Sequence, residues 1–341
     1  MEGHRHGGVV RVEGDARQRY FDSSGYGRPH GSGVDLAPIE AAHLLYRGEL
    51  DAVEGERFRG YFLSVAESDP GFVARFVAYA DLRERGFYLS PAREGWPGDA
   101  DSTADLTVFE RGDRPGGSVA YHVRVVGERD PVAVTDLPGT ALAVVDEESE
   151  VSYFTCSTAS FDGATTFDPP TGLPATLLGD RAVCWDPPAA LYGSGFYGQP
   201  LSGRDAAVVD ALQLSLVEAA RLAEIGVIDV TPDAVRDRGR AVEGERFDRR
   251  LAVYRTLREQ GVVPKTGFKF GADFRTYDEV TSVDELGHSE TLVWVVPPDY
   301  EIGPRELALD VRLAGGVRKR PVFALADDEV RRAVAVERLT P

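Results

Sequence analysis

The stretch FVARFVAYADLRERG, residues 72–86, recurs in related form as FDRRLAVYRTLREQG, residues 247–261. In both stretches, Phe, Tyr and Leu lie at the three- and four-residue intervals of a helix with one buried face, and each ends in a glycine that can stop the helix. Nearer the start of each half, PIEAAHLLYRGELDA resembles LVEAARLAEIGVIDV, which pairs Glu40 with Glu218. Similarity at a shift of about half the chain predicts two tandem repeats.

Both predicted repeats continue from helices into short apolar runs that are typical of strands. In the second repeat these runs are TLVWVV, PVFALA and AVAVERL, and the first repeat has YHVRVV, ALAVV and VSYFTC in the same order. The pattern favours an α+β fold in which each repeat has a small helix-rich α/β N-terminal subdomain followed by a mixed-sheet subdomain.

Pro- and Gly-rich sequence separates the two predicted repeats, as in FDPPTGLP and WDPPAALYGSG. Such composition is typical of an extended connector, so we expect a linker at residues 158–190. On this basis the N-terminal subdomains are residues 1–65 and 191–245. The mixed-sheet subdomains are residues 66–157 and 246–341.

The composition limits the classes of partner. The 341 residues are 43% hydrophobic, enough for two cores, and 56 acidic against 38 basic residues give a net charge of −18. This charge disfavours a general binder of nucleic acid or of anionic membranes, so any bound polyanion needs a local basic patch. Only three of the 38 bases are lysines. An acidic, Arg-rich, Lys-poor composition is suited to a protein that works in concentrated salt, because the salt screens the repulsion between its acidic groups.

The sequence shows no sign of a membrane segment, a disulfide framework or a metal site. No apolar run approaches the about 20 residues that span a bilayer, and the first residues lack the apolar stretch of a signal peptide. Cys156 and Cys184 are isolated thiols, as expected in a reducing compartment. We therefore expect a soluble cytoplasmic protein with no metal or other cofactor.

Three side chains capable of acid, base or cationic chemistry occur in the second repeat and are lost from the first. They are Tyr277, His288 and Lys319. Alignment of the strand-like runs gives their counterparts as Phe109, Ser118 and Pro138. A single Tyr, His or Lys is more often structural than catalytic. These three residues, however, share one repeat and lie at the ends of predicted helices or strands, which favours a catalytic site.

The segment 304–320 is locally basic. It holds five bases and two acids, so its charge is positive by three within a chain that is negative by eighteen. Pro304 can begin a helix, and Gly315 and Gly316 can end it. Lys319 then lies directly before the next predicted strand. The segment is a candidate phosphate-binding surface, with a solvated helix face as the alternative.

These residues resemble the archaeal tRNA-splicing endonucleases, in the fused form in which one chain carries two repeats and works as a homodimer. The resemblance is carried by YRTLREQG, KTGFKFGADFRTY, GHSETLVWVV and RLAGGVRKRPVFAL, in the family's order. It is strongest from Phe247 onward. The pair Gly315–Gly316 and the C-terminal ERLTP depart from the family pattern.

The resemblance implies a catalytic subdomain with a triad. Tyr277 would take the proton of an RNA 2′-OH, His288 would protonate the leaving 5′-oxygen, and Lys319 would stabilise the charge that develops on phosphorus. No metal is implied. The products would carry 2′,3′-cyclic phosphate and 5′-OH ends.

The resemblance also implies partners. The substrate would be precursor tRNA with a bulge-helix-bulge at its exon–intron junctions, where Arg312 and Arg338 would hold a bulged base between their guanidinium groups. A homodimer would use an acidic loop of the non-catalytic repeat, which docks in a groove of the partner. The candidate loop residues are Asp146, Glu147, Glu148 and Glu150, with an ordinary acidic hairpin turn as the alternative.

Two other functions remain open from the residues alone. One is a non-catalytic RNA-binding or interaction scaffold built from a duplicated domain. The other is a metal-dependent nuclease, whose local carboxylates would be Asp273, Asp278 and Glu279.

Overall fold

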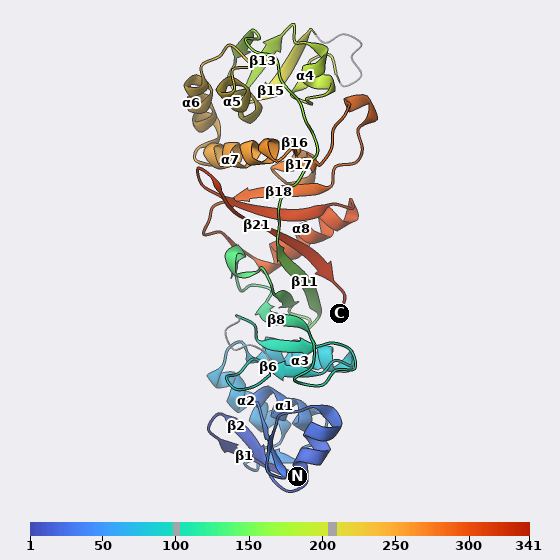
Figure 1. The fold of residues 1–341 in the computed structure, drawn as a ribbon. Helices are drawn as coiled ribbons and strands as arrows, with labels where there is room; N and C mark the ends of the chain where they lie inside the picture. The colour runs from blue at the N-terminus through green and yellow to red at the C-terminus, as the bar shows by residue number, and fades with distance from the viewer. Residues whose placement is uncertain (98–102, 204–209) are drawn as a thin grey trace. The chain divides into compact units, whose positions relative to one another are not determined.

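The computed structural model describes residues 1–97, 103–203 and 210–341, and these divide into two units (Figure 1). Unit 1 is Met1–Ser157 with Glu301–Leu309 and Glu337–Pro341, and unit 2 is Thr158–Tyr300 with Asp310–Val336. Each unit has its own hydrophobic core.

Unit 1 begins with a small sheet beside two helices. The strand order is β3-β4-β2-β1-β5. The elements are β1 (Glu2–His6), β2 (Val9–Val12), a short π-helix (Arg17–Asp22), β3 (Arg28–His30), β4 (Gly33–Leu36), α1 (Pro38–Tyr46), β5 (Ala52–Val53) and α2 (Phe58–Ser68).

The remainder of unit 1 is a mixed sheet in the order β6-β7-β8-β10-β11, in which only β8 and β10 run parallel. The helix α3 (Phe72–Glu84) packs against this sheet and is the one expected from the sequence. The strands are β6 (Leu89–Pro91), β7 (Leu106–Phe109), β8 (Val119–Gly127), β9 (Val132–Ala133, paired with β19, Glu301–Ile302), β10 (Ala141–Val145) and β11 (Val151–Thr158).

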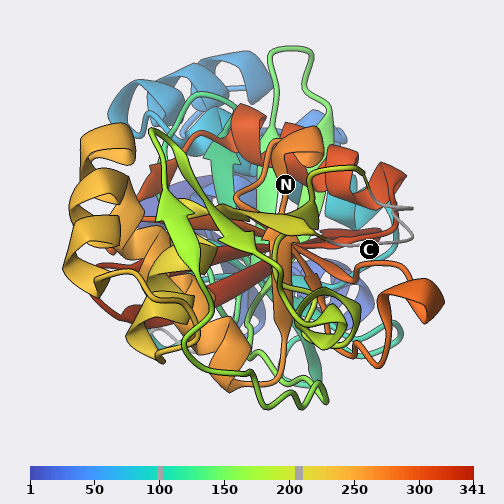
Figure 2. The same cartoon turned by 90° about the horizontal axis from the view of Figure 1, so that it is seen from above.

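Unit 2 also begins with a small sheet, in the order β12-β13-β15-β14, beside helices that pack against one another (Figure 2). The elements are β12 (Ala175–Leu177), β13 (Arg181–Trp185), α4 (Ala189–Gly193), β14 (Gln199–Pro200), β15 (Ala211–Ser215), α5 (Leu216–Glu224) and α6 (Pro232–Glu243).

The expected linker at residues 158–190 needs correction, because it contains β12 and β13. Both strands join the small sheet of unit 2, with β13 paired to β15 over five residues. The prolines that suggested a connector flank these strands, where a missing backbone N–H interrupts no ladder. The connecting part is therefore shorter than its composition predicted.

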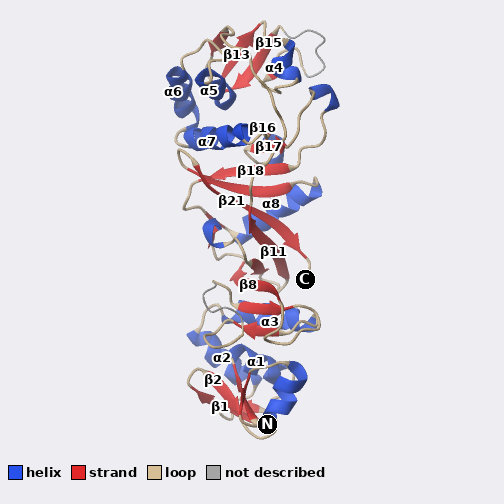
Figure 3. Cartoon of the chain, in the orientation of Figure 1, coloured by secondary structure: helices blue, strands red, loops and turns tan. Residues whose placement is uncertain are grey.

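The second sheet of unit 2 has the order β16-β17-β18-β20-β21, and β18 and β20 run parallel (Figure 3). The helix α7 (Arg246–Glu259) packs on one face, while Ala314 of α8 (Pro304–Gly316) contacts Leu292 on the other. The strands are β16 (Val263–Thr266), β17 (Phe274–Tyr277), β18 (Thr291–Val296), β20 (Arg320–Ala326) and β21 (Val330–Leu339).

The architecture is mixed α and β, as the sequence predicted. The glycines expected to stop α3 and α7 do adopt positive φ, at 90° for Gly86 and 73° for Gly261. The helix α8 begins at Pro304, as expected, and it buries Leu307, Val311 and Ala314. Among the described residues, no helix is long and apolar enough to cross a membrane.

Candidate active site

The three predicted catalytic residues lie at the ends of adjacent strands. Tyr277 is the last residue of β17, His288 precedes β18 by three residues, and Lys319 immediately precedes β20. Because β17 is antiparallel to β18 and β18 is parallel to β20, these three ends meet at the same edge of the sheet. The topology therefore brings the three positions together, although 42 residues separate the first from the last.

Hydrogen bonds connect the three strand ends. The Nζ of Lys319 donates to the carbonyl oxygen of Ser289, next to His288, at 2.5 Å. The backbone N–H of Arg320 donates to Glu290 O at 3.0 Å, and Glu290 N–H donates to Thr276 O at 3.0 Å. The segment that carries His288 is thus fixed between the strand ends that carry Tyr277 and Lys319.

Lys319 is placed by the end of α8. Arg318 adopts the left-handed conformation, with φ 56°, and the N–H of Lys319 returns to the carbonyl of Ala314 at 2.9 Å. This ending turns the chain from the helix into β20. The Lys319 side chain is half-buried, and its Nζ lies 5.6 Å from the centre of the Phe270 ring. Partial burial lowers the pKa of the Lys319 ammonium, the nearby charge of Arg275 lowers it further, and Glu290 acts against both.

Tyr277 and His288 differ in exposure. Tyr277 is 5% exposed, and its ring lies 5.6 Å from that of Phe196, with the guanidinium of Arg275 5.8 Å from its centre. His288 is exposed in a loop. Among the described residues there is no hydrogen bond between the three side chains, so the structure brings them to one edge without joining them directly.

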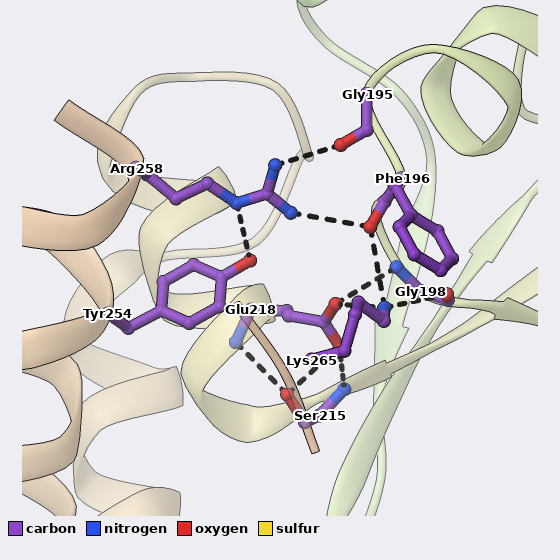
Figure 4. A network of polar contacts seen from close by, with 8 residues as sticks. All are labelled: Gly195, Phe196, Gly198, Ser215, Glu218, Tyr254, Arg258 and Lys265. Atoms are coloured by element: carbon purple, nitrogen blue, oxygen red, sulfur yellow. Dashed lines mark hydrogen bonds and ion pairs between the residues drawn. The ribbon is translucent and has the colours of Figure 1, made fainter. Parts of the chain in front are cut away.

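A buried polar network joins Glu218, Lys265 and Arg258 to the loop that carries Phe196 (Figure 4). The ring of Phe196 in turn contacts Tyr277. The carboxylate of Glu218 on α5 accepts from Lys265 Nζ at 2.8 Å and from Gly198 N–H at 3.1 Å. Burial by itself raises the pKa of Glu218, but the ammonium of Lys265 and the N–H of Ser215 more than offset it, so this pKa lies below the ordinary value. Glu218 therefore remains ionised inside the protein.

The same network holds the loop that contacts Tyr277. Arg258 on α7 lies over the Tyr197 ring at 3.8 Å and donates to Gly195 O at 2.8 Å and to Phe196 O at 3.3 Å. Phe196 is held at a positive φ of 48°, which a residue with a side chain adopts only when its surroundings impose it. The network thus fixes the ring against which Tyr277 packs.

Sequence reasoning missed the pair Glu218–Lys265. Glu218 was visible as the counterpart of Glu40, and Lys265 is one of only three lysines in the chain. These two signals existed separately, but 47 positions separate the residues and no local pattern connects them.

Glu40 is buried in unit 1 without a lysine partner. It is 0% exposed and accepts from the N–H groups of Gly27 and Ala37, both at 2.9 Å. Burial raises the pKa of Glu40 to about 7, and Arg28 and Arg83 counteract this only in part. Ser90 holds the position aligned with Lys265, so unit 1 has no ammonium there.

We expect Glu40→Gln to stabilise the protein at alkaline pH. A carboxyl whose pKa is raised in the folded state does not lower the free energy of unfolding at pH values below its unfolded pKa near 4.5. As the pH rises towards 7, it lowers that free energy by a growing amount. The full cost is about 3 kcal/mol by the usual conversion of pKa into free energy. Urea unfolding followed by tryptophan fluorescence should give equal stability for variant and wild type near pH 4.5 and a more stable variant at pH 8.

The matched control for this prediction is Glu218→Gln, since Glu218 is also buried but is paired with Lys265. This variant should be destabilised at pH 8. If Glu40→Gln gave the same difference in unfolding free energy at both pH values, the raised pKa of Glu40 would be wrong.

A cavity of about 580 Å³ opens beside the network in unit 2. Its lining includes Lys269 and Arg275, which form no ion pair with any of the described residues, and the Nε of Arg275 is buried without a hydrogen-bond partner. Two other lining cations, Arg181 and Arg250, are already paired with carboxylates. The cavity therefore offers unpaired positive charge within an acidic protein.

The remaining predicted binding residues lie on the surface. Arg312 is exposed on α8, and Arg338 is exposed on β21. The residues Asp146–Glu150 form the turn between β10 and β11, where the Asp146 carboxylate accepts from the N–H groups of Glu148 at 2.9 Å and Glu150 at 2.8 Å. This is a well-formed acidic hairpin turn.

The carboxylates considered for a metal-dependent nuclease do not form a common site. Asp273 is 7% exposed, forms ion pairs with Arg246 at 2.6 Å and with Arg250 at 3.0 Å, and accepts a hydrogen bond from the N–H of Val295 at 2.9 Å. It is thus already neutralised as part of the fold, whereas Asp278 and Glu279 are exposed.

Comparison with known proteins places this arrangement in one family. Residues 247–331 match the family described as tRNA intron endonuclease, catalytic C-terminal domain, and residues 1–61 and 173–237 match its N-terminal domain. Proteins named tRNA-splicing endonuclease are similar over nearly their whole length. One from Natronomonas pharaonis is 56% identical with 100% of both chains covered, one from Haloarcula marismortui 56% with 98% of both, and one from Methanosarcina mazei 38% with 92% of both.

The chain therefore belongs to the tRNA intron endonuclease family. It is an endonuclease of tRNA introns, which confirms the enzyme class that the resemblance implied. Its high similarity to proteins of halophiles agrees with the acidic, Lys-poor composition. The match at residues 173–237 also agrees with the strands found inside the expected linker.

Proposed function

We propose that this chain removes introns from precursor tRNA in the cytoplasm, using Tyr277, His288 and Lys319 and no metal. The proposal depends chiefly on one observation, the hydrogen bond from Lys319 Nζ to the carbonyl of Ser289, which holds the cation beside His288 at the strand edge where β17 ends. In unit 1 the aligned positions hold Phe109, Ser118 and Pro138, so the corresponding sheet edge lacks the phenol, imidazole and ammonium groups.

The proposed reaction is an in-line attack by the RNA on itself. Tyr277 accepts the proton of the 2′-OH as the new bond from the 2′-oxygen to phosphorus forms, and His288 gives a proton to the 5′-oxygen as the old bond breaks. The ammonium of Lys319 stabilises the extra negative charge on the phosphorane oxygens. The products are a 2′,3′-cyclic phosphate and a 5′-OH, and protons and electrons balance without a further reactant.

The substrate is proposed to be a bulge-helix-bulge. Bulged nucleotides are unstacked, so their bases can stack on the guanidinium planes of arginines such as Arg312 and Arg338, each of which is exposed. The five bases between residues 304 and 320 supply local positive charge within an acidic chain.

We also propose that the chain consists of two tandem repeats, each with an N-terminal subdomain (1–65, and 191–245 together with the strands β12 and β13) and a mixed-sheet subdomain (66–157, 246–341). Equivalent contacts support this division. Arg83 lies over Tyr26 at 4.1 Å and donates to Ser24 O, as Arg258 lies over Tyr197 and donates to Gly195 O. The strand orders of the two mixed sheets also correspond one to one.

A direct test is cleavage of an intron-containing precursor tRNA in near-molar salt with EDTA, with the same tRNA lacking its intron as the control substrate. We expect two cuts in the precursor, 2′,3′-cyclic phosphate ends, and 5′-OH ends that a polynucleotide kinase labels without prior phosphatase treatment. Tight binding without scission would favour the scaffold function, and loss of activity with chelator would favour a metal-dependent nuclease.

The proposed homodimer would place the acidic turn of one protomer in the cationic cavity of its partner. The turn carries Glu147, Glu148 and Glu150, all exposed, and the cavity offers the unpaired cations Lys269 and Arg275. Charge complementarity supports this pairing and explains why two cations are left without a carboxylate inside their own unit.

We expect the triple change of Glu147, Glu148 and Glu150 to Gln to weaken the dimer about a hundredfold, at roughly 1 kcal/mol for each charge. Asp146 is kept because its carboxylate shapes the turn. Analytical ultracentrifugation over a concentration series measures the change. Neutralising Asp327, Asp328 and Glu329 in the hairpin between β20 and β21 is the control, and equal effects of the two triple variants would contradict the docking.

A further inference from the structure

A segment of unit 2 runs between the end of α7 and the loop that follows Tyr277. We name this segment, Gly163–Thr165, the strap. On one side, Ala164 N–H donates to Asp278 O at 2.7 Å and Val280 N–H donates to the hydroxyl of Thr165 at 2.9 Å. The strap therefore holds the chain directly after the last residue of β17.

On its other side the strap is fixed to a rigid helix end. Gly163 N–H donates to Gln260 O at 2.8 Å, and Thr165 N–H donates to Gly261 O at 3.0 Å. Residues 278–282, directly after Tyr277, belong to no helix or strand, so their position depends on these bonds more than on a sheet ladder. Through the strap, the end of α7 determines the path of the chain beyond Tyr277.

The strap requires two glycines in direct backbone contact. A Cβ on Gly163 would lie 2.4 Å from the carbonyl oxygen of Gly261, and a Cβ on Gly261 would lie 2.6 Å from that of Gly163. The aligned Gly86 of unit 1 has no atom within 4 Å of a Cβ built on it. The close contact therefore occurs beside Tyr277 and is missing beside Phe109, the counterpart without catalytic chemistry.

We propose that the strap, and Thr165 in particular, positions Tyr277 for catalysis. This inference rests on the proposed role of Tyr277 as the group that accepts the 2′-OH proton. Two contacts already constrain Tyr277. Its backbone pairs with Val263 of β16, and its ring packs against the ring of Phe196. The strap supplies a third constraint, because it fixes the backbone that follows Tyr277. This constraint matters because an attack in line with the leaving oxygen tolerates little displacement of the base.

The central experiment compares Thr165→Val with Thr165→Ser in single-turnover cleavage of a precursor tRNA. Valine keeps the shape and removes the oxygen that accepts from Val280, whereas serine keeps the oxygen. We expect Thr165→Val to lower the maximal rate about tenfold with an unchanged half-saturating concentration, and Thr165→Ser to retain the wild-type rate. Thr166→Val, at the exposed neighbouring position, is the control and should cleave normally.

A second variant acts on the strap by a different route. Gly163→Ala would force the strap away from Gly261, so we expect a loss of rate at least as large as that of Thr165→Val. Urea unfolding of each variant separates a local effect from loss of the fold. If both strap variants cleaved at the wild-type rate while remaining folded, the positioning role would be refuted.

Tyr277→Phe distinguishes failure of the strap from failure of the proposed catalytic role. If Tyr277→Phe cleaves normally, the proposed role of the phenol is wrong. If it is slow while Thr165→Val is normal, only the strap inference is wrong. If both inferences hold, adding Thr165→Val to Tyr277→Phe lowers the rate little further, because the group being positioned is already lost.

Discussion

Replacement of His288 by Ala should slow cleavage of a precursor tRNA by about 10²- to 10⁴-fold, the usual contribution of one positioned acid. His288 lies at the strand edge where Lys319 Nζ meets the carbonyl of Ser289. Without the imidazole, the 5′-oxygen must leave as an alkoxide or take its proton from water. Because His288 is exposed and outside both hydrophobic cores, the fold itself should be retained.

The decisive measurement is the single-turnover rate, with RNA affinity determined separately by filter binding. Free imidazole should restore part of the activity of His288→Ala, since the vacated position is open to solvent. His30→Ala is a matched control, because His30 is an exposed histidine of unit 1. An undiminished rate for His288→Ala would remove His288 as the acid.

Replacement of Lys265 by Met should destabilise unit 2 by about 3–5 kcal/mol, the usual cost of removing one partner from a buried ion pair. Glu218 and Lys265 are both largely buried and meet at 2.8 Å, so the change leaves a carboxylate without its main counter-charge. Lys265 Nζ also donates to Gly198 O at 3.0 Å, so the loop that carries Phe196 should loosen as well. Urea unfolding at pH 8 measures the free energy.

The double variant Glu218→Gln/Lys265→Met tests the reason for this loss. It removes both charges, so it should recover much of the stability that Lys265→Met loses. Arg331→Met is the control, because its pairs with Asp327 and Glu329 are exposed and should contribute less than about 1 kcal/mol. A double variant as unstable as the single one would show that packing, and not charge, causes the loss.

The sequence singled out the candidate site residues, but it predicted the geometry around them only in part. The comparison of the two halves singled out Tyr277, His288 and Lys319, because substitution by Phe, Ser and Pro removes chemistry without changing the strand pattern. It could not predict that Tyr277 would be 5% exposed against Phe196, since that contact joins residues 81 positions apart. The roles of the triad, of Arg312 and Arg338 and of the acidic turn stay predictions.

One repeated heptapeptide shows the limit of local information. AVEGERF occurs at residues 52–58 and again at 241–247. At the first site Ala52 and Val53 form β5, and both Glu54 and Gly55 take a positive φ, of 49° and 75°. At the second site Ala241–Glu243 end α6, and Gly244 takes a positive φ of 64°. The same seven residues therefore adopt two structures, selected by the elements against which each copy packs.

By itself the sequence determined the amphipathic helices α3, α7 and α8, the strand runs, the family and the residues able to do chemistry, because these depend on residue type and on short-range periodicity. Only the tertiary structure decided that Lys265 neutralises Glu218, that Asp273 is paired with two arginines, and that the strap is hydrogen-bonded to the chain directly after β17. These contacts join residues that are distant along the chain. Their partners are selected when elements pack and desolvate their charges, a choice that no local pattern encodes.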